Sequence, residues 1–498
     1  MGLLGVDLDV LVSIISFLSP KDARSLSRTT RALHPIAQNR ALSVVVLDTP
    51  TKLFRAHEYL LGDVETRLRC LRVLTVTSRA LKPPTRTDDG DADVLRLDAG
   101  SARALAELFE NVPSLQEVSL ECTEVLLQLE PRIWNALTTL TVLAVVEFKD
   151  AHAGVLARLR GFRGPLRKLT LHGFVDPNTA ESPSTKLSFA GLANAWCAYP
   201  QLEHIGLSNV DIVTTDPGQA IFAPCYNVHS LDISHSRGPL PSIIDILPNI
   251  RSLSVCYTRG HTDADVDQAE KCFGHLTLVR YRTIYARPVL PWVPTSAVRR
   301  LDLANVVETD TKRYWSFPQH YANLVQKTQP LILCLSTCSS TGSEFWTGVV
   351  CGGRLRCLNV RLHANWRCHT NMSEWLDKVP TFWKNSNLLY VRIYIGEANF
   401  LSRMDIPASL REDTAAAITF VRQTTSERLL TCVPSVRLIA VKLIDETSWW
   451  RVQRNGDGEP GRRLVPISRD VGHHVEAYLY SEEFEQTLVL DESRFDHR

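Results

Sequence analysis

The stretch Leu166-Arg167-Lys168-Leu169-Thr170-Leu171 carries the pattern that decides the fold, L-x-x-L-x-L. Its last apolar positions alternate, which is typical of a short strand with one buried face. Apolar residues take the same three places at many further sites, most of them about 22–36 residues apart. The further triplets are Leu71/Leu74/Val76, Leu115/Val118/Leu120, Leu140/Leu143/Val145, Leu202/Ile205/Leu207, Val228/Leu231/Ile233, Ile250/Leu253/Val255, Leu276/Val279/Tyr281, Val298/Leu301/Leu303, Leu355/Leu358/Val360, Leu388/Val391/Ile393 and Val436/Ile439/Val441.

A period of this length predicts an α/β fold, a leucine-rich-repeat-like solenoid over residues 46–445. Each repeat would supply one strand and one helix or irregular return, and would leave an apolar face for its neighbour to cover. We expect a first strand in residues 43–48 and a degenerate one in residues 331–335, inside the longest gap. The alternative is a doubly wound sheet of unrelated βα units, which a dozen units would overfill.

Residues 1–45 are predicted to form three helices. Asp7 can cap the first, and His34-Pro35 starts the third. Residues 19–22, Ser-Pro-Lys-Asp, provide the cap, the proline and the acid of a second helix start. Three helices of about 40 residues in total bury little core, so this module needs a partner, either the rest of the chain or another protein.

The first helix has apolar residues in two adjacent stripes at helical spacing. One stripe can pack within the module while the other faces a partner. The stripes are Val10/Ile14/Phe17 and Leu11/Ile15/Leu18. Acidic substitution of both Leu11 and Ile15 is predicted to abolish binding of that partner.

This N-terminal stretch resembles the F-box, whose pattern runs L-P-x-E/D-hydrophobic-L, I-x-x-x-L, D, L and a basic or aromatic residue before a last Leu. Asp7 stands at the usual Pro and Val6 at the usual Leu. With its repeats and its Trp449-Trp450 pair, the chain looks like a fungal F-box protein with divergent leucine-rich repeats. The residues that fall on the pattern are Asp9, Val10, Leu11, Ile14, Leu18, Asp22, Leu26, Arg31 and Leu33.

The resemblance implies a substrate-recognition subunit of an SCF-type cullin–RING E3 ubiquitin ligase, which performs no bond chemistry itself. The helices would dock on the Skp-type adaptor, and the repeats would hold a target protein. The alternatives are a repeat scaffold whose F-box has drifted into a helical cap, outside any ligase, and an enzyme with an unrecognised site. The implied adaptor-binding residues are Val6, Leu8, Val10, Leu11, Ile14, Ile15, Leu18, Leu26 and Leu33.

Basic and aromatic residues stand beside the apolar positions of the later repeats. Period-2 alternation turns such residues to the concave strand face. Arg and Tyr dominate binding hot spots, and Arg favours bidentate contact with carboxylate or phosphate. We therefore expect either an acidic or phosphorylated target segment on this face or, alternatively, a solvated surface. The residues are Arg280, Arg282, Arg300, Arg361, Tyr390, Arg392 and Tyr394.

Residues 446–498 break the repeat and are predicted to cap the open end of the solenoid. Strands at 449–452 and 464–467 would form a hairpin, followed by an amphipathic helix over residues 468–485 and a frayed acidic tail. Gly456, Gly458 and Gly461 match the dinucleotide-binding fingerprint in letters. A strand follows them instead of a helix, so we interpret them as a hairpin turn.

Composition argues against several other classes. The balance of 55 Lys and Arg against 54 Asp and Glu speaks against bulk nucleic-acid or anionic-membrane binding. No apolar window reaches transmembrane length, and acids rather than cations open the N-terminus, unlike a secretory signal. We expect an intracellular location, cytoplasmic or nuclear. Twelve scattered cysteines without C-x-x-C predict reduced thiols and no metal or other cofactor.

Overall fold

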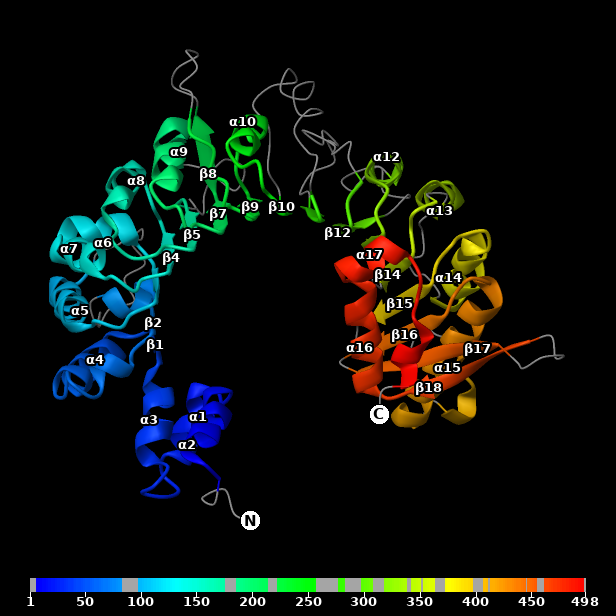
Figure 1. Ribbon diagram of the computed structural model, residues 1–498, viewed down its shortest axis with the longest axis horizontal. Coiled ribbons are helices and arrows are strands. Elements are labelled where there is room, and N and C mark those ends of the chain that lie inside the picture. Colours follow the sequence, from blue (N-terminus) through cyan, green and yellow to red (C-terminus); the bar gives the residue numbers. More distant parts are fainter. Residues whose placement is uncertain are drawn as a thin grey trace. The chain divides into compact units, whose positions relative to one another are not determined.

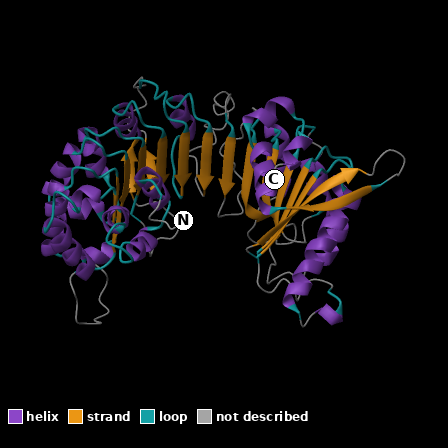
Figure 2. Ribbon diagram, turned by 60° about the horizontal axis from the view of Figure 1, so that its bottom comes forward, coloured by secondary structure: helices purple, strands orange, loops and turns teal. Residues whose placement is uncertain are grey.

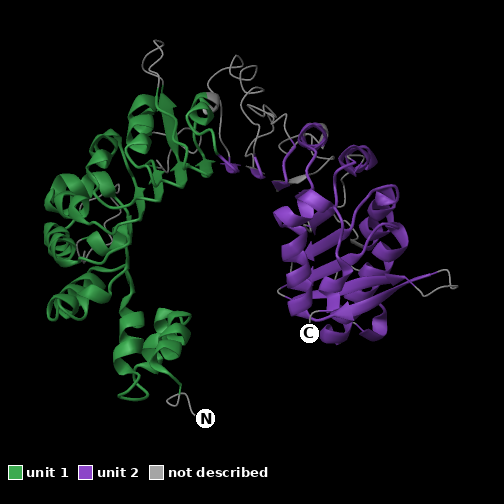
Figure 3. Ribbon diagram, viewed as in Figure 1, with its two compact units in different colours: residues 1–249 green, residues 250–498 purple. Residues whose placement is uncertain are grey.

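The computed structural model describes residues 6–82, 97–174, 185–213, 222–256, 276–282, 297–307, 318–337, 342–350, 353–362, 372–396, 406–410, 413–444, 446–454 and 461–496. The chain divides into two compact units, unit 1 at residues 1–249 and unit 2 at residues 250–498 (Figure 3). In each unit, parallel strands alternate with helices or 3₁₀ turns along most of the chain. The predicted α/β repeat fold is thus confirmed in both units.

Unit 1 begins with three short helices and continues into the repeats. Its helices are α1 (Leu8–Ser16), α2 (Pro20–Leu26), α3 (His34–Leu42), α4 (Pro50–Leu61), α5 (Ala99–Asn111), α6 (Thr123–Leu129), α7 (Arg132–Thr139), α8 (Ala153–Arg158), α9 (Phe189–Cys197) and α10 (Leu240–Asp245). The 3₁₀ turns are η2 (Leu68–Cys70), η3 (Ser78–Leu81) and η4 (Leu159–Gly161). The strands are β1 (Val44–Leu47), β2 (Val73–Val76), β3 (Glu117–Leu120), β4 (Val145–Lys149), β5 (Lys168–His172), β6 (Thr185–Ser188), β7 (His204–Ser208), β8 (Val210–Val213) and β9 (Ser230–Ser234).

The core of unit 1 is a ladder of apolar residues across parallel strands in constant register. Leu74, Val118, Val146, Leu169 and Ile205 are neighbours on β2, β3, β4, β5 and β7, and each is fully buried. Burial of each such side chain is worth about 1.5–3 kcal/mol. These rungs, repeated once per strand, hold the sheet together.

One predicted triplet is wrong in register. Leu140 and Leu143 precede the strand, and Val145 lies half-buried at its start. The residues that continue the ladder are Val146 and Phe148, paired with Val118 and Leu120. Leu143, Val146 and Phe148 satisfy the same L-x-x-L-x-L spacing, so the pattern alone allowed both alignments.

Two features of unit 1 were not predicted. A separate two-stranded parallel sheet joins β6 and β8. In addition, a residue with left-handed backbone follows the strand at the same place in several repeats, two positions after the last core residue. These residues are Cys122, Asp150, Asn209 and His235, with φ between 49° and 57°. Asn, Asp and His tolerate this conformation better than most residues, so three of the four suit the turn.

Unit 2 has longer strands than unit 1. Its helices are α12 (Pro318–Thr328), α13 (Ser343–Val350), α14 (Met372–Lys378), α15 (Thr414–Cys432), α16 (Arg469–Leu479) and α17 (Glu482–Thr487). Its strands are β10 (Ser252–Cys256), β11 (Leu278–Arg282), β12 (Arg300–Val307), β13 (Ile332–Thr337), β14 (Cys357–Leu362), β15 (Tyr390–Ile395), β16 (Leu438–Leu443), β17 (Glu446–Arg454) and β18 (Arg462–Ile467). Its 3₁₀ turns are η5 (Val379–Trp383), η7 (Ala408–Leu410) and η8 (Glu492–Asp496). Among the residues described, no helix has both the length and the apolarity of a membrane span.

The C-terminal segment differs from its prediction in two ways. The hairpin is confirmed, since β17 pairs antiparallel with β16 and with β18, although its turn at residues 455–460 lies outside the described residues. The expected single helix is two helices, α16 and α17, separated at Tyr480 and Ser481. The expected frayed tail is wrong as far as Asp496, because η8 forms there and Phe495 is buried. The Ser481 side chain accepts the Phe484 amide at the start of α17, which explains the new helix.

In both units the helices between the strands cover one face of the sheet (Figures 1 and 2). We call the opposite face the strand face. In unit 2, α16 and α17 lie on the strand face and α12–α15 lie on the other (Figure 1). In unit 1, strand-face side chains on β4 and β5 remain half-buried or exposed. The two strand faces therefore offer different surfaces to a partner.

Candidate protein-binding surfaces

The N-terminal helices α1, α2 and α3 enclose a small core. Leu11, Ile15, Leu33 and Ala37 are buried together, and Val6, Leu18, Leu26 and Ile36 pack partly buried around them. The Ser19 hydroxyl accepts the Asp22 amide and caps α2, as predicted. Asp7 occupies the cap position of α1, but its side chain accepts no backbone hydrogen bond there. The predicted carboxylate cap of α1 is therefore wrong.

One apolar stripe of α1 faces outward. Val10 and Ile14 are 48% and 42% exposed, and Phe17, directly after the helix, is 86% exposed. At 3.6 residues per turn these three residues share one side of the helix. We call Val10, Ile14 and Phe17 the docking stripe. Leu8 and Val12 are also exposed, on the other side of the buried pair Leu11 and Ile15.

The nine residues predicted to bind the adaptor fall into exposed, buried and half-buried groups. Leu8, Val10 and Ile14 are exposed, whereas Leu11, Ile15 and Leu33 are buried in the module. Val6, Leu18 and Leu26 are half-buried at the edge of that core. The prediction that acids at Leu11 and Ile15 would test docking is corrected, because those side chains hold the module together. Phe17, missing from the predicted set, is the most exposed large apolar residue of α1 and its end.

Two adjacent isoleucines provide a matched test of this division. Ile15→Ala is expected to destabilise the module by about 2–5 kcal/mol, because it removes a fully buried side chain. Ile14→Ala is expected to change stability by less than about 1 kcal/mol, because Ile14 is exposed. Amide hydrogen exchange across α1–α3 measures both. Equal loss of protection in the two variants would contradict the assignment.

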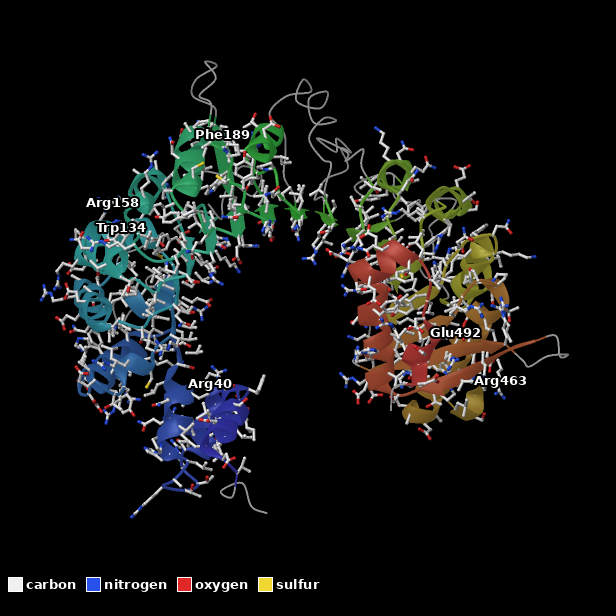
Figure 4. All side chains as sticks on the ribbon, in the orientation of Figure 1. Arg40, Trp134, Arg158, Phe189, Arg463 and Glu492 are labelled. Atoms are coloured by element: carbon white, nitrogen blue, oxygen red, sulfur yellow. The ribbon has the colours of Figure 1, made fainter. Side chains whose placement is uncertain are left out.

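Helix α3 attaches the module to the repeats of unit 1. Arg40 Nε donates to the Leu18 carbonyl at 2.9 Å, and Arg40 Nη1 donates to Ser43 Oγ at 3.1 Å, just before β1 (Figure 4). Gln38 donates to the Tyr59 hydroxyl on α4 at 2.9 Å. The Cys70 thiol on η2 donates to Asn39 at 3.1 Å. Helix α3 thus links the end of α1, which carries the docking stripe, to the first repeat.

The strand face of unit 2 is covered by the chain's own C-terminal helices. Val475, Leu479 and Phe484 are fully buried against strand residues that include Ile332 and Tyr390. Trp449 on β17 belongs to the same core and stacks on Tyr390 at 6.2 Å between ring centroids. An apolar contact of this extent makes α16 and α17 part of the folded core of unit 2.

A buried carboxylate on α16 joins this core to the strands. Glu476 is 8% exposed and accepts hydrogen bonds from Tyr390 at 2.9 Å and from Arg392 at 2.7 Å. The Tyr480 hydroxyl lies at 3.3 Å from the same oxygen. The sequence predicted an amphipathic helix over residues 468–485 but did not indicate that Glu476 is buried. Burial raises the pKa of Tyr390 well above its ordinary value, so its hydroxyl remains a donor.

Acidic residues near the C-terminus pair with arginines of unit 2. Glu485 contacts both Arg299 and Arg354 at 2.5 Å. Arg451 contacts Glu492 and Asp496, each at 3.3 Å. The sequence predicted an acidic segment of a target on this strand face. In the structure, an acidic segment of the same chain occupies it.

Only part of the predicted target-binding set remains accessible. Tyr390 is fully buried and Arg392 is bonded to Glu476, so both are corrected to structural residues. Arg300 pairs with Asp302 at 2.7 Å, and Arg280, about half exposed, lies 3.4 Å from the same carboxylate. Asp302 therefore brings the two arginines together.

The remaining members of the set surround one aromatic ring. Arg361 is exposed and lies over the Tyr394 ring at 4.8 Å. Lys442 lies over the same ring at 4.9 Å, so two cations share Tyr394. The side chain of Arg282 lies outside the described residues.

The strand face of unit 1 carries a polar and charged surface. His172 Nε2 contacts Glu147 at 3.1 Å, and Lys149 contacts Glu121 at 3.0 Å. The first pair joins β5 to β4, and the second joins β4 to Glu121, directly after β3. Acids, hydroxyls and imidazoles alternate with the core residues along these strands. The residues are Glu117, Ser119, Glu121, Lys168, Thr170, His172, His204, Ser208, Ser230, Asp232 and Ser234.

The Glu147 pair predicts a dependence of stability on pH. The hydrogen bond from His172 lowers the pKa of Glu147 from 4.5 to about 2, with a further bond from Ser119. A carboxyl whose pKa is lower in the folded protein stabilises it above the unfolded pKa. We therefore expect this stabilisation to be lost as pH falls from about 4.5 to about 2. Glu147→Gln should reduce the change of the thermal unfolding midpoint with pH in this range. An unchanged dependence on pH would contradict the assignment.

No protein-family model matches the chain, and no curated protein matches it. Among solved structures, 44 chains match. One of them, described as "Crystal structure of TLR13-ssRNA13 complex", has 15% sequence identity and a TM-score of 0.33. That match covers 67% of this chain and 41% of the other, so the chain spans less than half of that structure's length.

Proposed function

We propose that this chain is a non-catalytic substrate-recognition subunit of an SCF-type cullin–RING ubiquitin ligase. The docking stripe binds the Skp-type adaptor, and the repeats hold the target protein. The observation that carries the proposal is the division of α1, with Leu11 and Ile15 buried and Val10, Ile14 and Phe17 exposed. A module that needed only to cap the repeats would have no use for an outward apolar stripe.

The chemistry of the stripe fits a protein partner. Exposed apolar residues gathered on one side of a helix mark interaction sites, whereas single exposed residues need no explanation. An amphipathic helix that lays its apolar side into a hydrophobic groove is a common recognition mode. The stripe lies within the residues that resemble the F-box, and that family docks on its adaptor through these helices.

We propose that the target binds the strand face of unit 1. In unit 2, three of the predicted arginines pair with acids of the same chain: Arg280 and Arg300 with Asp302, and Arg392 with Glu476. In unit 1, Lys168 is exposed and half-buried His204 is its register partner on β7. Half-buried Glu117 lies in the same row two strands away, beyond Val145. Polar side chains that alternate along several strands can read a protein surface by hydrogen bonds and charge. We therefore propose that unit 1, rather than unit 2, holds the target.

Titration of the full-length chain with a purified Skp-type adaptor tests the proposal. Isothermal calorimetry should show one adaptor per chain with a dissociation constant of about 1 μM or tighter, and Phe17→Ala should weaken it by about tenfold. The complex should also recruit the cullin–RING core in a pull-down. Absence of binding at about 100 μM adaptor would reject the ligase assignment.

A second candidate function is a repeat scaffold outside any ligase. The observation in its favour is Asp7, a charged residue where the F-box pattern has Pro, whose side chain caps nothing in α1. In that case the docking stripe would bind a partner other than the adaptor. The same titration separates the two functions, because only the first requires the adaptor to bind.

A further inference from the structure

Two cysteines of unit 1 lie in direct contact. Cys197, the last residue of α9, has its Sγ 3.0 Å from Sγ of Cys225 in the segment before β9. Cys197 is exposed and Cys225 is half-buried. The cysteines that the structure describes are all free thiols. A disulfide has its sulfurs about 2.05 Å apart, so closing this pair requires a shift of about 1 Å.

The backbone around both thiols is held in place from several sides. The Cys197 thiol donates to the Ala223 carbonyl at 3.0 Å. Asn227 donates to the Pro200 carbonyl, and the Cys225 amide donates to the Ile246 carbonyl at 2.7 Å. The end of α9 is thus bonded to the segment around Cys225 on both sides of the pair. The two sulfurs meet because the fold places them together, without the constraint of a covalent bond.

We propose that Cys197 and Cys225 form a reversible disulfide under oxidation by a peroxide, which makes this pair a redox modification site. The Cys197 sulfur, the more exposed of the two, attacks one oxygen of hydrogen peroxide. The O–O bond breaks, Cys197 becomes a sulfenic acid, and the released hydroxide takes up the thiol proton as water. The Cys225 sulfur then attacks the sulfenic sulfur, the S–O bond breaks and a second water leaves. In total, two thiols lose two protons and two electrons, and one peroxide becomes two waters.

The burial of Cys225 directs the first step to Cys197. Burial, together with the hydrogen bond to Cys197, raises the pKa of Cys225 to about 12. Cys225 therefore rests as a thiol, and a peroxide meets Cys197 first. Disulfides of proteins that work in a reducing compartment are usually transient or sensory, and a thiol pair already in contact fits that use.

Mass spectrometry of the oxidised full-length protein tests the proposal. No Lys or Arg lies between Lys186 and Arg237, so trypsin leaves both cysteines on one peptide. A glutamate-specific protease then cuts at Glu203, between them. After hydrogen peroxide treatment and alkylation of remaining thiols, we expect residues 187–203 and 204–237 to stay joined. Their combined mass should be about 2 Da below the sum of the thiol forms, and reductant should separate them.

Single substitutions control the experiment. Cys197→Ser and Cys225→Ser should each abolish the joined species. Cys70→Ser is the matched control, because the Cys70 thiol contacts Asn39 and Thr66 rather than a cysteine, and it should leave the species unchanged. Recovery of alkylated or sulfinic Cys197 on a separate peptide after oxidation would overturn the proposal, as would a bond from either residue to another cysteine.

Discussion

A chain carrying Ile14→Asp and Phe17→Asp stays folded but binds the Skp-type adaptor at least about 100-fold more weakly than the wild type. Each of these side chains, fully buried in a partner's groove, would contribute about 1.5–3 kcal/mol. Both are exposed in the free chain, so the acids cost little before binding. In the complex, the acids would have to give up water without a partner. Calorimetric titration with the adaptor measures the effect.

Val12→Asp is the matched control for this change. Val12 is 46% exposed, similar to Ile14 at 42%. At about 100° per residue it lies about 160° around α1 from both Val10 and Ile14. We expect adaptor affinity within about threefold of the wild type for Val12→Asp. If Val12→Asp weakens binding as much as the double change does, the partner contacts the other side of α1 and the docking stripe is wrong.

Glu476→Ala is expected to destabilise the strand-face core of unit 2 by about 3–5 kcal/mol. The substitution leaves Arg392, itself largely buried, without its carboxylate at 2.7 Å, and removes the acceptor of the Tyr390 hydroxyl. A buried charge that loses its partner costs more than the pair contributes. Amide hydrogen exchange of α16 and β15 measures the local opening free energy.

Two further variants keep this prediction specific. Glu482 pairs with Arg299 at 3.1 Å but is 66% exposed, so Glu482→Ala should change stability by less than about 1 kcal/mol. Replacing both Arg392 and Glu476 by Met removes both charges and should restore most of the loss. A loss for Glu476→Ala that is no larger than for Glu482→Ala would show that the buried pair does not hold α16 in place.

The repeats were largely predictable because their determinant is local. A leucine two residues before a strand, with apolar residues at alternate positions within it, is enough to place β2, β3, β5 and β7. The same rule left the alignment of β4 open, since Leu140 and Leu143 both offer a start. It also missed β6 and β8, which form outside the repeat period.

The binding surfaces were less predictable because they depend on contacts between distant segments. Two stripes of α1 were recognised, but only the packing of Leu33 and Ala37 against Leu11 and Ile15 decides which stripe is inside. The sequence predicted that the arginines of unit 2 are available to a target. No local sequence pattern indicates that Arg392 binds Glu476, which lies far along the chain. The alternation of Tyr390 and Arg392 with apolar neighbours had given the correct face of the sheet. It does not encode what covers that face.

Helix α3 has a mechanical consequence for whatever the module holds. Helix α3 is hydrogen-bonded both to the segment after α1 and to the first repeat. A protein bound to the docking stripe is therefore not attached to the repeats through a flexible linker. The orientation of that protein relative to anything held by unit 1 depends on the rotation of α3 rather than on the length of a linker. Each residue added to α3 would rotate the bound protein by about 100° and move it by about 1.5 Å along the helix axis. Insertions or deletions in α3 would therefore change the orientation of the bound protein in steps of one residue, more than they change its distance from the repeats.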